Sequence, residues 1–377
     1  MNNTTESNPK PVGGTVLVYA ARLQEPEHER VVHFDIGRRI ASLLGMDFGG
    51  LYEPERRYPG AIYYLPTETI IGQAMAESLG ITSENDLFGG VAPHAFVPTK
   101  AISHGLIDGT APSPEGWSPE FTRRTADSVL RGYTCFTLAD ARVAGARLLN
   151  FGALRIKPVH ATGGRGQVLV SDGAQLDEAL REIDTSRLGD SGVVLEEHLD
   201  DVKTYSVGQI RVAGIIASYV GTQRLTVDNV GQEVYGGSDL VIARGNFDAL
   251  LLADLPEHFR VAVGKAQRYD QAANDCFQRF FASRRNYDVA SGLDHAGQPR
   301  VGVLEQSWRV GGASNAEIAA VEVFHANPHI RMVRASTIEL FGDHEPPPGP
   351  AVQVYRGEDD EIGLVSKYVS VEPYGNE

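Results

Sequence analysis

A glycine-rich turn between two apolar strands is the feature that most restricts the folds open to this chain. Residues 155–170 read RIKPVHATGGRGQVLV, so Lys157 closes one predicted strand and three glycines precede the next. Glycines let a backbone approach a polyphosphate closely, and a lysine at the strand end adds a positive charge. Because a strand rather than a helix follows the turn, the segment is neither a P-loop nor a Rossmann fingerprint. An ordinary glycine hairpin with a solvent-exposed lysine explains the segment alone about equally well.

A second segment, VVLEEHLDD at residues 193–201, is a predicted buried strand that runs into an acidic turn. A strand of this kind can serve as a hinge between two lobes. Backbone groups there can pair with the edge of an adenine ring, while Glu196 accepts a hydrogen bond from the exocyclic amine. For the segment taken alone, a strand that simply reaches the surface at an acidic turn is the simpler interpretation.

Two carboxylates end the next pair of predicted strands. Asp288 lies on one strand and Glu305 on the other, across a turn at residues 294–297. Such a hairpin can bring both carboxylates to the same end of neighbouring strands, and Mg²⁺ binds through one or two carboxylates plus phosphate oxygens. Arg309 follows in EQSWRVGG, where it can neutralise a transferring phosphoryl group or an oxyanion. A surface ion pair between Arg309 and Glu305 is the alternative.

Charge and apolar content exclude several classes of partner. The chain has 34 basic and 49 acidic residues, a formal charge of −15 and no long basic run, which disfavours nucleic acids and membrane surfaces. No stretch approaches the ~20 apolar residues of a membrane span. Because residues 1–11 are polar, we expect no secretory signal there, and we expect Cys135 and Cys276 to be thiols. We therefore expect a cytoplasmic protein that acts on a small molecule.

Taken in order, the three segments resemble the ATP-grasp superfamily, which includes D-alanine–D-alanine ligase, glutathione synthetase and biotin carboxylase. In that family a strand lysine precedes a flexible glycine loop, and a hinge of the form E-x-x-L follows. The resemblance, over roughly residues 95–320, therefore implies a nucleotide-binding set of Lys157, Gly163, Gly164, Arg165, Gly166, Glu196, Glu197, His198 and Leu199.

The resemblance also implies a metal site. An acidic residue followed by E-x-N-x-R on the next strand is matched by Asp288, Glu305, Ser307 and Arg309. Ser307 thus stands where most relatives have a metal-binding asparagine. Either Asn315 compensates for it, or one of two magnesium ions is held only weakly.

Two further residues are implied near the nucleotide phosphates. Lys100 is the candidate for an earlier lysine that reaches them. Arg224, next to Gln223 in YVGTQRLT, is in a position where related enzymes have phosphate-facing residues, so Arg224 and Arg309 are the catalytic candidates.

The expected fold class is α/β or α+β, an ATP-grasp fold with ATP between its last two lobes. Hydrophobic periodicity predicts strands at 15–20 and 61–65 and helices at 35–44 and 69–79 in the first lobe. The predicted divisions are a disordered lead-in at 1–14, an N-terminal α/β lobe at 15–125, a small lobe with the glycine-rich loop at 126–195, a C-terminal lobe with the metal ligands at 196–345, and an acidic, irregular tail at 346–377.

The function implied is that of a ligase that uses ATP and Mg to activate a small carboxylate as an acyl phosphate for attack by an amine or similar nucleophile. A small-molecule kinase on the same fold is one alternative. A nucleotide-binding protein without catalysis, which Ser307 favours, is the other. A homodimer is left open.

Overall fold

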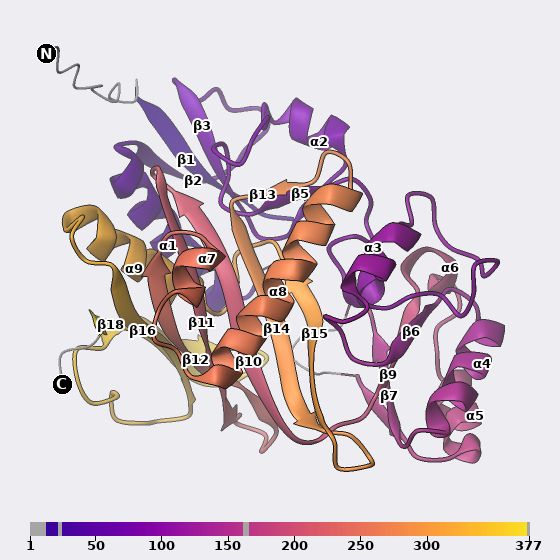
Figure 1. Ribbon diagram of the computed structural model, residues 1–377. Coiled ribbons are helices and arrows are strands. Elements are labelled where there is room, and N and C mark those ends of the chain that lie inside the picture. The colour runs from indigo at the N-terminus through magenta and orange to yellow at the C-terminus, as the bar shows by residue number, and fades with distance from the viewer. Residues whose placement is uncertain (1–12, 22–24, 161–165, 375–377) are drawn as a thin grey trace, which may run out of the picture.

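The computed structural model describes residues 13–21, 25–160 and 166–374, and the strands within these residues form four sheets (Figure 1). The mixed α/β class is as predicted. In the first sheet, β1 (Gly14–Tyr19) pairs in parallel with β2 (Asp47–Leu51) on one side and β3 (Ala61–Pro66) on the other. Helix α1 (Glu27–Leu44) covers this sheet and ends at Gly45, whose φ of 67° is left-handed, so the predicted stop is confirmed.

The helix predicted at 69–79 is wrong in its first half. Residues there form β4 (Ile70–Ile71), and α2 (Gln73–Ser78) begins only after Gly72, whose φ of 86° is incompatible with a right-handed helix. Strand β4 pairs with β5 (Gly90–Ala92), which pairs in turn with β13 (Phe281–Ala282). This small sheet joins the N-terminal region to a strand from far along the chain.

A four-stranded sheet of order β6-β9-β7-β8 forms a separate layer, at the right of Figure 1. Its strands are β6 (Gly132–Cys135), β7 (Leu154–Pro158), β8 (Val168–Val170) and β9 (Val193–Glu197). Helices α4 (Leu138–Leu149) and α5 (Gly173–Arg181) pack beside it, with the short α6 (Leu188–Ser191) before β9. A side chain at Gly145 of α4 would lie only 2.6 Å from Leu176 of α5, so this glycine permits the close helix contact.

The largest sheet has eight antiparallel strands in the order β15-β14-β10-β11-β12-β16-β18-β17. Their bounds are β10 (Asp200–Val212), β11 (Ile215–Val227), β12 (Glu233–Arg244), β14 (Arg284–Leu293), β15 (Pro299–Ser307), β16 (Met332–Phe341), β17 (Val352–Asp359) and β18 (Gly363–Pro373). Because alternate residues of a strand face opposite sides, β10 contributes Val207 to one core and Ile210 to another.

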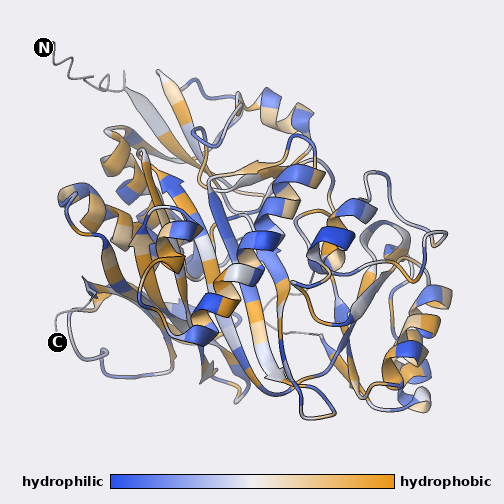
Figure 2. Ribbon diagram, viewed as in Figure 1, coloured by the Kyte–Doolittle hydropathy of each residue, from blue (hydrophilic) through white to orange (hydrophobic). Residues whose placement is uncertain are grey.

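Helices cover both faces of this sheet. On one face lie α7 (Phe247–Leu251), α8 (Glu257–Cys276) and α3 (Pro119–Thr125), whose Phe121 packs edge-on against Tyr269 of α8 at 5.0 Å between ring centres. On the other face lies α9 (Ser314–Ala326), which is mostly hydrophobic in Figure 2 because it is buried between the sheet and α1. The sheet therefore organises most of the core.

The expectation of an irregular tail at 346–377 is wrong. Residues 352–373 form the hairpin of β17 and β18, and the acidic stretch that suggested irregular structure lies at its turn. Val365 and Val369 of β18 are buried, and this strand pairs along β16. The proposed boundary at residue 345 thus falls inside one continuous sheet.

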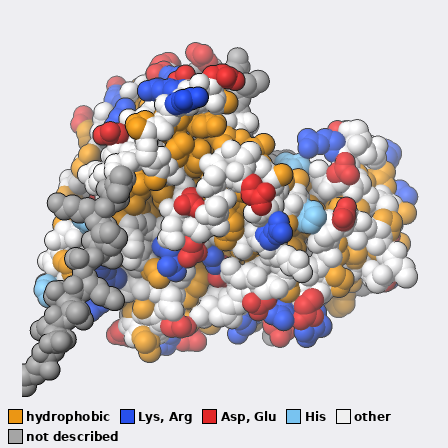
Figure 3. All heavy atoms as spheres, turned by 90° about the horizontal axis from the view of Figure 1, so that it is seen from above, with side chains coloured by type: hydrophobic (Ala, Val, Ile, Leu, Met, Phe, Trp, Pro, Cys, Tyr) orange, Lys and Arg blue, Asp and Glu red, His pale blue; other side chains and the backbone are white. Residues whose placement is uncertain are grey.

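The structure can be compared with the predictions about charge, membrane spans and cysteines. On the face shown in Figure 3, acidic and basic side chains of the described residues are interspersed. Within the described ranges, no helix is both long and apolar enough to cross a membrane. Cys135 and Cys276 are free thiols, as expected, and burial raises the pKa of Cys135 to about 12.

Candidate functional site

A short 3₁₀ turn, η1 (Lys100–Ser103), is attached to two sheets at once. Gln306 of β15 donates to the carbonyls of Val97 (2.8 Å) and Thr99 (2.7 Å), and Ser103 Oγ donates to the carbonyl of Leu304 (3.0 Å). On its other side, Thr134 Oγ1 of β6 donates to the carbonyl of Ala101 at 2.6 Å. The turn is therefore fixed between the large sheet and the small one.

At its first residue, η1 presents Lys100 to the acidic pair. Lys100 is buried, and its Nζ lies 3.0 Å from Glu305 Oε2. Glu305 of β15 is directly opposite Asp288 of β14, as the hairpin argument predicted. Asp288 Oδ1 accepts hydrogen bonds from Gln223 (2.8 Å) and Asn286 (3.1 Å). Burial and the charge of Glu305 raise the pKa of Asp288.

The carboxylate oxygens of Asp288 and Glu305 are suitable ligands for a hard cation such as Mg²⁺. Two neighbouring carboxylates repel each other, and a divalent ion would relieve that repulsion. Among the described residues, however, no group of three or more His, Cys, Asp or Glu side chains is placed to hold a metal. Any further ligand from the described residues must therefore be an amide, a hydroxyl or a backbone carbonyl.

At its other end, η1 leads to a second charged group. His104 follows the turn, and its Nε2 lies 2.9 Å from Glu196 Oε2, while Lys157 Nζ donates to Glu196 Oε1. All three side chains are buried. Burial alone would raise the pKa of Glu196, but the charge of Lys157 and the hydrogen bond to His104 outweigh it and bring the pKa to about 2. Glu196 is thus a carboxylate with both oxygens engaged.

This arrangement modifies the role expected for Glu196. A purine amine would have to displace one of its two existing partners. His104 was missed by sequence reasoning, because it forms no motif with Glu196 and meets it only through the packing of η1. Lys157 is on β7 and pairs with Val194 of β9, the predicted hinge strand.

The rest of the predicted hinge holds strands together. Glu197 accepts from the backbone N–H of Arg131 (2.8 Å) and pairs with Arg300 of β15 (3.1 Å). The N–H of His198 donates to the carbonyl of Ala153 at 2.9 Å. Leu199 is buried in a small apolar cluster. Of the glycine-rich loop, Gly163, Gly164 and Arg165 lie outside the described residues, and Gly166 closes the loop with a φ of 67°.

Arg309 lies near the same junction, at the end of β15. Its Nε is 3.4 Å from Glu68 Oε2 in the segment between β3 and β4. Burial and the charges of Arg187 and Lys100 lower the pKa of His160, and Glu68 acts in the opposite direction. Side chains from the N-terminal region, η1 and the small sheet therefore lie within electrostatic range of His160. The alternative interpretation, an ion pair between Arg309 and Glu305, is absent from the ion pairs of the described residues, where Glu305 pairs with Lys100.

Two predicted residues lie elsewhere. Gln223 faces Asp288, so its neighbour Arg224 points to the opposite side of β11, where its guanidinium lies 3.1 Å from Asp239 Oδ2 and donates to the carbonyl of Thr337. Asn315 Oδ1 accepts from Arg39 of α1 at 3.4 Å. The contacts of Arg224 therefore lie on the side of the sheet opposite the acidic pair, and the suggestion that Asn315 replaces the missing asparagine stays a prediction.

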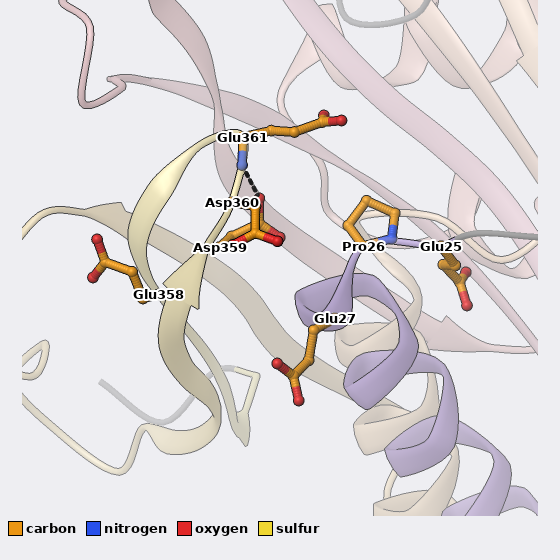
Figure 4. A pocket seen from close by; sticks show the side chains of 7 residues that line it. All are labelled: Glu25, Pro26, Glu27, Glu358, Asp359, Asp360 and Glu361. Carbon is orange, nitrogen blue, oxygen red and sulfur yellow. Dashed lines mark hydrogen bonds between the residues drawn. The ribbon is translucent and has the colours of Figure 1, made fainter.

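A pocket of about 380 Å³ is found at a different place, between the start of α1 and the β17–β18 turn (Figure 4). Its lining residues are Glu25, Pro26, Glu27, Glu358, Asp359, Asp360 and Glu361. Asp359 Oδ2 is paired with His28 at 2.9 Å, and its Oδ1 accepts from the backbone N–H of Glu361. The acidic side chains shown in Figure 4 point in several directions rather than toward one centre.

Known proteins resemble the chain in fold. The family described as "Protein of unknown function (DUF3182)" matches residues 16–369, and no curated protein matches. N5-carboxyaminoimidazole synthetase from Staphylococcus aureus, complexed with ADP, is 11% identical with a TM-score of 0.56, over 98% of this chain and 96% of that one. The biotin carboxylase domain of 2-oxoglutarate carboxylase from Hydrogenobacter thermophilus, in complex with MgADP, is 13% identical with a TM-score of 0.52, over 95% and 86%.

Proposed function

Because the chain belongs to the DUF3182 family, whose function is unknown, and has the ATP-grasp fold, we propose that it is an ATP- and Mg-dependent ligase. It activates a small-molecule carboxylate as an acyl phosphate, which an amine or similar nucleophile then attacks. The observation that carries the proposal is the position of η1. One turn presents Lys100 to the acidic pair and leads to His104 beside Lys157 and Glu196.

In this proposal the buried lysines bind phosphate oxygens. Lys157 and Lys100 each carry an ammonium group that is paired with a carboxylate within the protein. An anionic nucleotide would compete for these ammonium groups, and charge-assisted hydrogen bonds are the strong ones. Arg309, which is partly exposed beside Glu68, is placed to neutralise charge on the transferring phosphoryl group.

Asp288 and Glu305 would hold the magnesium ion. Bound there, the ion supplies positive charge that offsets the charge of the phosphate oxygens. The protein's part in the first step is mainly to position ATP and the carboxylate and to exclude water. ATP, magnesium and the acyl phosphate route are inferred from the fold and from the chemistry of these side chains, and a homodimer and a cytoplasmic location stay predictions.

The test is calorimetric titration of ATP, with and without Mg²⁺, into the wild type and the variants Lys157→Ala and Glu305→Ala. We expect magnesium-dependent binding in the wild type, a loss of about 10-fold or more in both variants, and a smaller magnesium dependence in Glu305→Ala. Lys265→Ala is the matched control, because the Lys265 ammonium group donates to the backbone carbonyl of Asp127 rather than to Glu196 or Glu305.

A folded wild type that binds no nucleotide would end the proposal. If ATP binds, release of ADP is measured with panels of small carboxylates and amines. Formation of ADP and an amide supports the ligase. ADP formed with a stable phosphorylated product, whatever amine is supplied, identifies a kinase instead. Tight binding with no turnover identifies a nucleotide-binding protein without catalysis.

A further inference from the structure

Ser307 is poorly placed to be the third metal ligand. Its Oγ lies 3.3 Å from Arg284 Nη1, which also donates to the carbonyl of Arg309 at 2.7 Å. Arg284 is buried and held by Glu317 through an Nη2–Oε1 contact of 2.7 Å. A hydroxyl that already accepts from a fixed guanidinium would bring a divalent cation close to a positive charge, which costs energy in a buried setting.

Directly across the strand pair from Ser307 lies Asn286 of β14. Asn286 is two residues before Asp288, so the two side chains share a face of the sheet. The amide Nδ2 of Asn286 is 3.1 Å from Asp288 Oδ1. Two neighbouring ligands of an octahedral Mg²⁺ at ~2.1 Å from the metal are roughly 3 Å apart. The amide group is therefore at the distance from Asp288 that a shared ion requires.

The single proton of the Tyr219 hydroxyl determines whether the Asn286 amide can turn its oxygen toward that ion. The Tyr219 hydroxyl lies 2.9 Å from Asn286 Oδ1 and 2.7 Å from Glu317 Oε1, and it has one proton to donate. If the proton goes to the carboxylate, the hydroxyl can accept from the amide NH₂ of Asn286. A half-turn of the amide then places NH₂ on Tyr219 and the oxygen beside Asp288, where a shared cation would bind both oxygens.

We propose that Asn286, together with Asp288 and Glu305, forms the divalent cation site, and that Ser307 is not a ligand. The inference rests on the proposed function, because it assigns a residue to the cation that accompanies the nucleotide. In effect, the amide oxygen missing from β15 is supplied by the residue paired with it on β14. Arg284, Glu317 and Tyr219 position that amide.

The test uses Mn²⁺ as a spectroscopic probe for Mg²⁺ and ADP as a nucleotide that cannot transfer a γ-phosphoryl group. Free Mn²⁺ is followed by electron paramagnetic resonance as the full-length protein is titrated in the presence of ADP. We expect Asn286→Ala to weaken Mn²⁺ binding by about 10-fold or more and Ser307→Ala to leave it within about 3-fold. Asn286→Asp, which keeps an oxygen donor, should restore binding.

Two controls separate a ligand from a residue that merely orients Asp288. Gln223→Ala removes a shorter hydrogen bond (2.8 Å) to the same Asp288 oxygen, so it should weaken binding at least as much as Asn286→Ala if both residues only orient Asp288. Because we assign Asn286 as a ligand, we expect Gln223→Ala to weaken binding less. Asn150→Ala, an exposed asparagine at the end of α4, controls for loss of an amide elsewhere. Circular dichroism of each variant establishes that it is folded.

The inference is overturned if Ser307→Ala weakens Mn²⁺ binding while Asn286→Ala does not. It is also overturned if Gln223→Ala and Asn286→Ala are equivalent and Asn286→Asp restores nothing. In either case, a wild type that still binds Mn²⁺ with ADP leaves the proposed function standing. A wild type that binds neither the nucleotide nor the ion removes the proposed function and this inference together.

Discussion

The ammonium group of Lys100 lies 3.0 Å from the carboxylate of Glu305, although more than half of the chain separates the two residues. The side chain of Lys100 is 5% exposed and that of Glu305 is 28% exposed. Glu305 also faces Asp288 across the β14–β15 pair. Lys100 therefore offsets part of the negative charge of two neighbouring carboxylates, and a cation and a nucleotide should respond to its loss in opposite ways.

Replacing Lys100 with methionine, which keeps the apolar stem and removes the charge, separates these two responses. We expect ATP to bind about 10-fold or more weakly, since a phosphate partner is lost. Mn²⁺ without nucleotide should bind more tightly, because the carboxylates are no longer opposed by a lysine. Separate calorimetric titrations of ATP and Mn²⁺ measure both effects, and Lys265→Met is the control. Equal weakening of both ligands would contradict this account.

The buried group of Lys157, Glu196 and His104 predicts a specific loss of stability in acid. The pKa of Glu196 is lowered from 4.5 to about 2 in the folded protein. A carboxylate with a lowered folded pKa stabilises the fold above its unfolded pKa, and this contribution is lost as the pH falls from about 4.5 toward 2. Glu196→Gln should destabilise the protein by roughly 3–5 kcal/mol at pH 7, because Lys157 is left buried without its partner.

Urea unfolding of the wild type and Glu196→Gln at several pH values between 7 and 3 measures this difference. The difference in the free energy of unfolding between the wild type and Glu196→Gln should become smaller as the pH falls below about 4.5. Glu120→Gln is a suitable comparison, since the pKa of Glu120 is also about 2 but its partners Arg123 and Arg124 are exposed. Salt should abolish the effect of Glu120→Gln and leave that of Glu196→Gln. A difference that does not change with pH would contradict the assignment.

Sequence reasoning succeeded where a structural feature is local. Alternating apolar residues and glycine stops predicted β1, β3 and the end of α1, and the turn between Asp288 and Glu305 predicted their pairing. The hairpin at residues 352–373 was missed because its acidic turn resembles an irregular tail, whereas the burial of Val365 depends on pairing with β16.

Two site residues were missed for the same reason, because their positions depend on contacts between distant parts of the chain. His104 meets Glu196 only because η1 is fixed between two sheets, and no spacing along the chain encodes that contact. Asn286 lies just before the strand predicted around Asp288, and its position opposite Ser307 requires the register of β14 and β15. A one-residue change of register would have turned it to the other face.

The contributions of Arg284 and Glu317 to the free energy of unfolding should depend strongly on each other. Their side chains are 2% and 0% exposed, and two guanidinium nitrogens contact the carboxylate. Breaking such a pair from one side leaves an uncompensated buried charge, so Arg284→Met and Glu317→Leu should each cost about 3–5 kcal/mol. The double variant should cost clearly less than the sum. Urea unfolding of the four proteins completes the cycle, and additive losses would show that the two residues act independently.

The β17–β18 hairpin should contribute to the stability of the whole sheet rather than behave as a tail. Val365 is 0% exposed and pairs with Phe341 of β16, whereas Val352, in the same hairpin, is 64% exposed. Val365→Ala removes two buried methyl groups and leaves a cavity, so we expect a loss of about 2 kcal/mol in the free energy of unfolding. Val352→Ala should change it by less than about 0.5 kcal/mol. Thermal and urea unfolding measure both, and equal effects of the two substitutions would mean that the hairpin does not pack as part of the sheet.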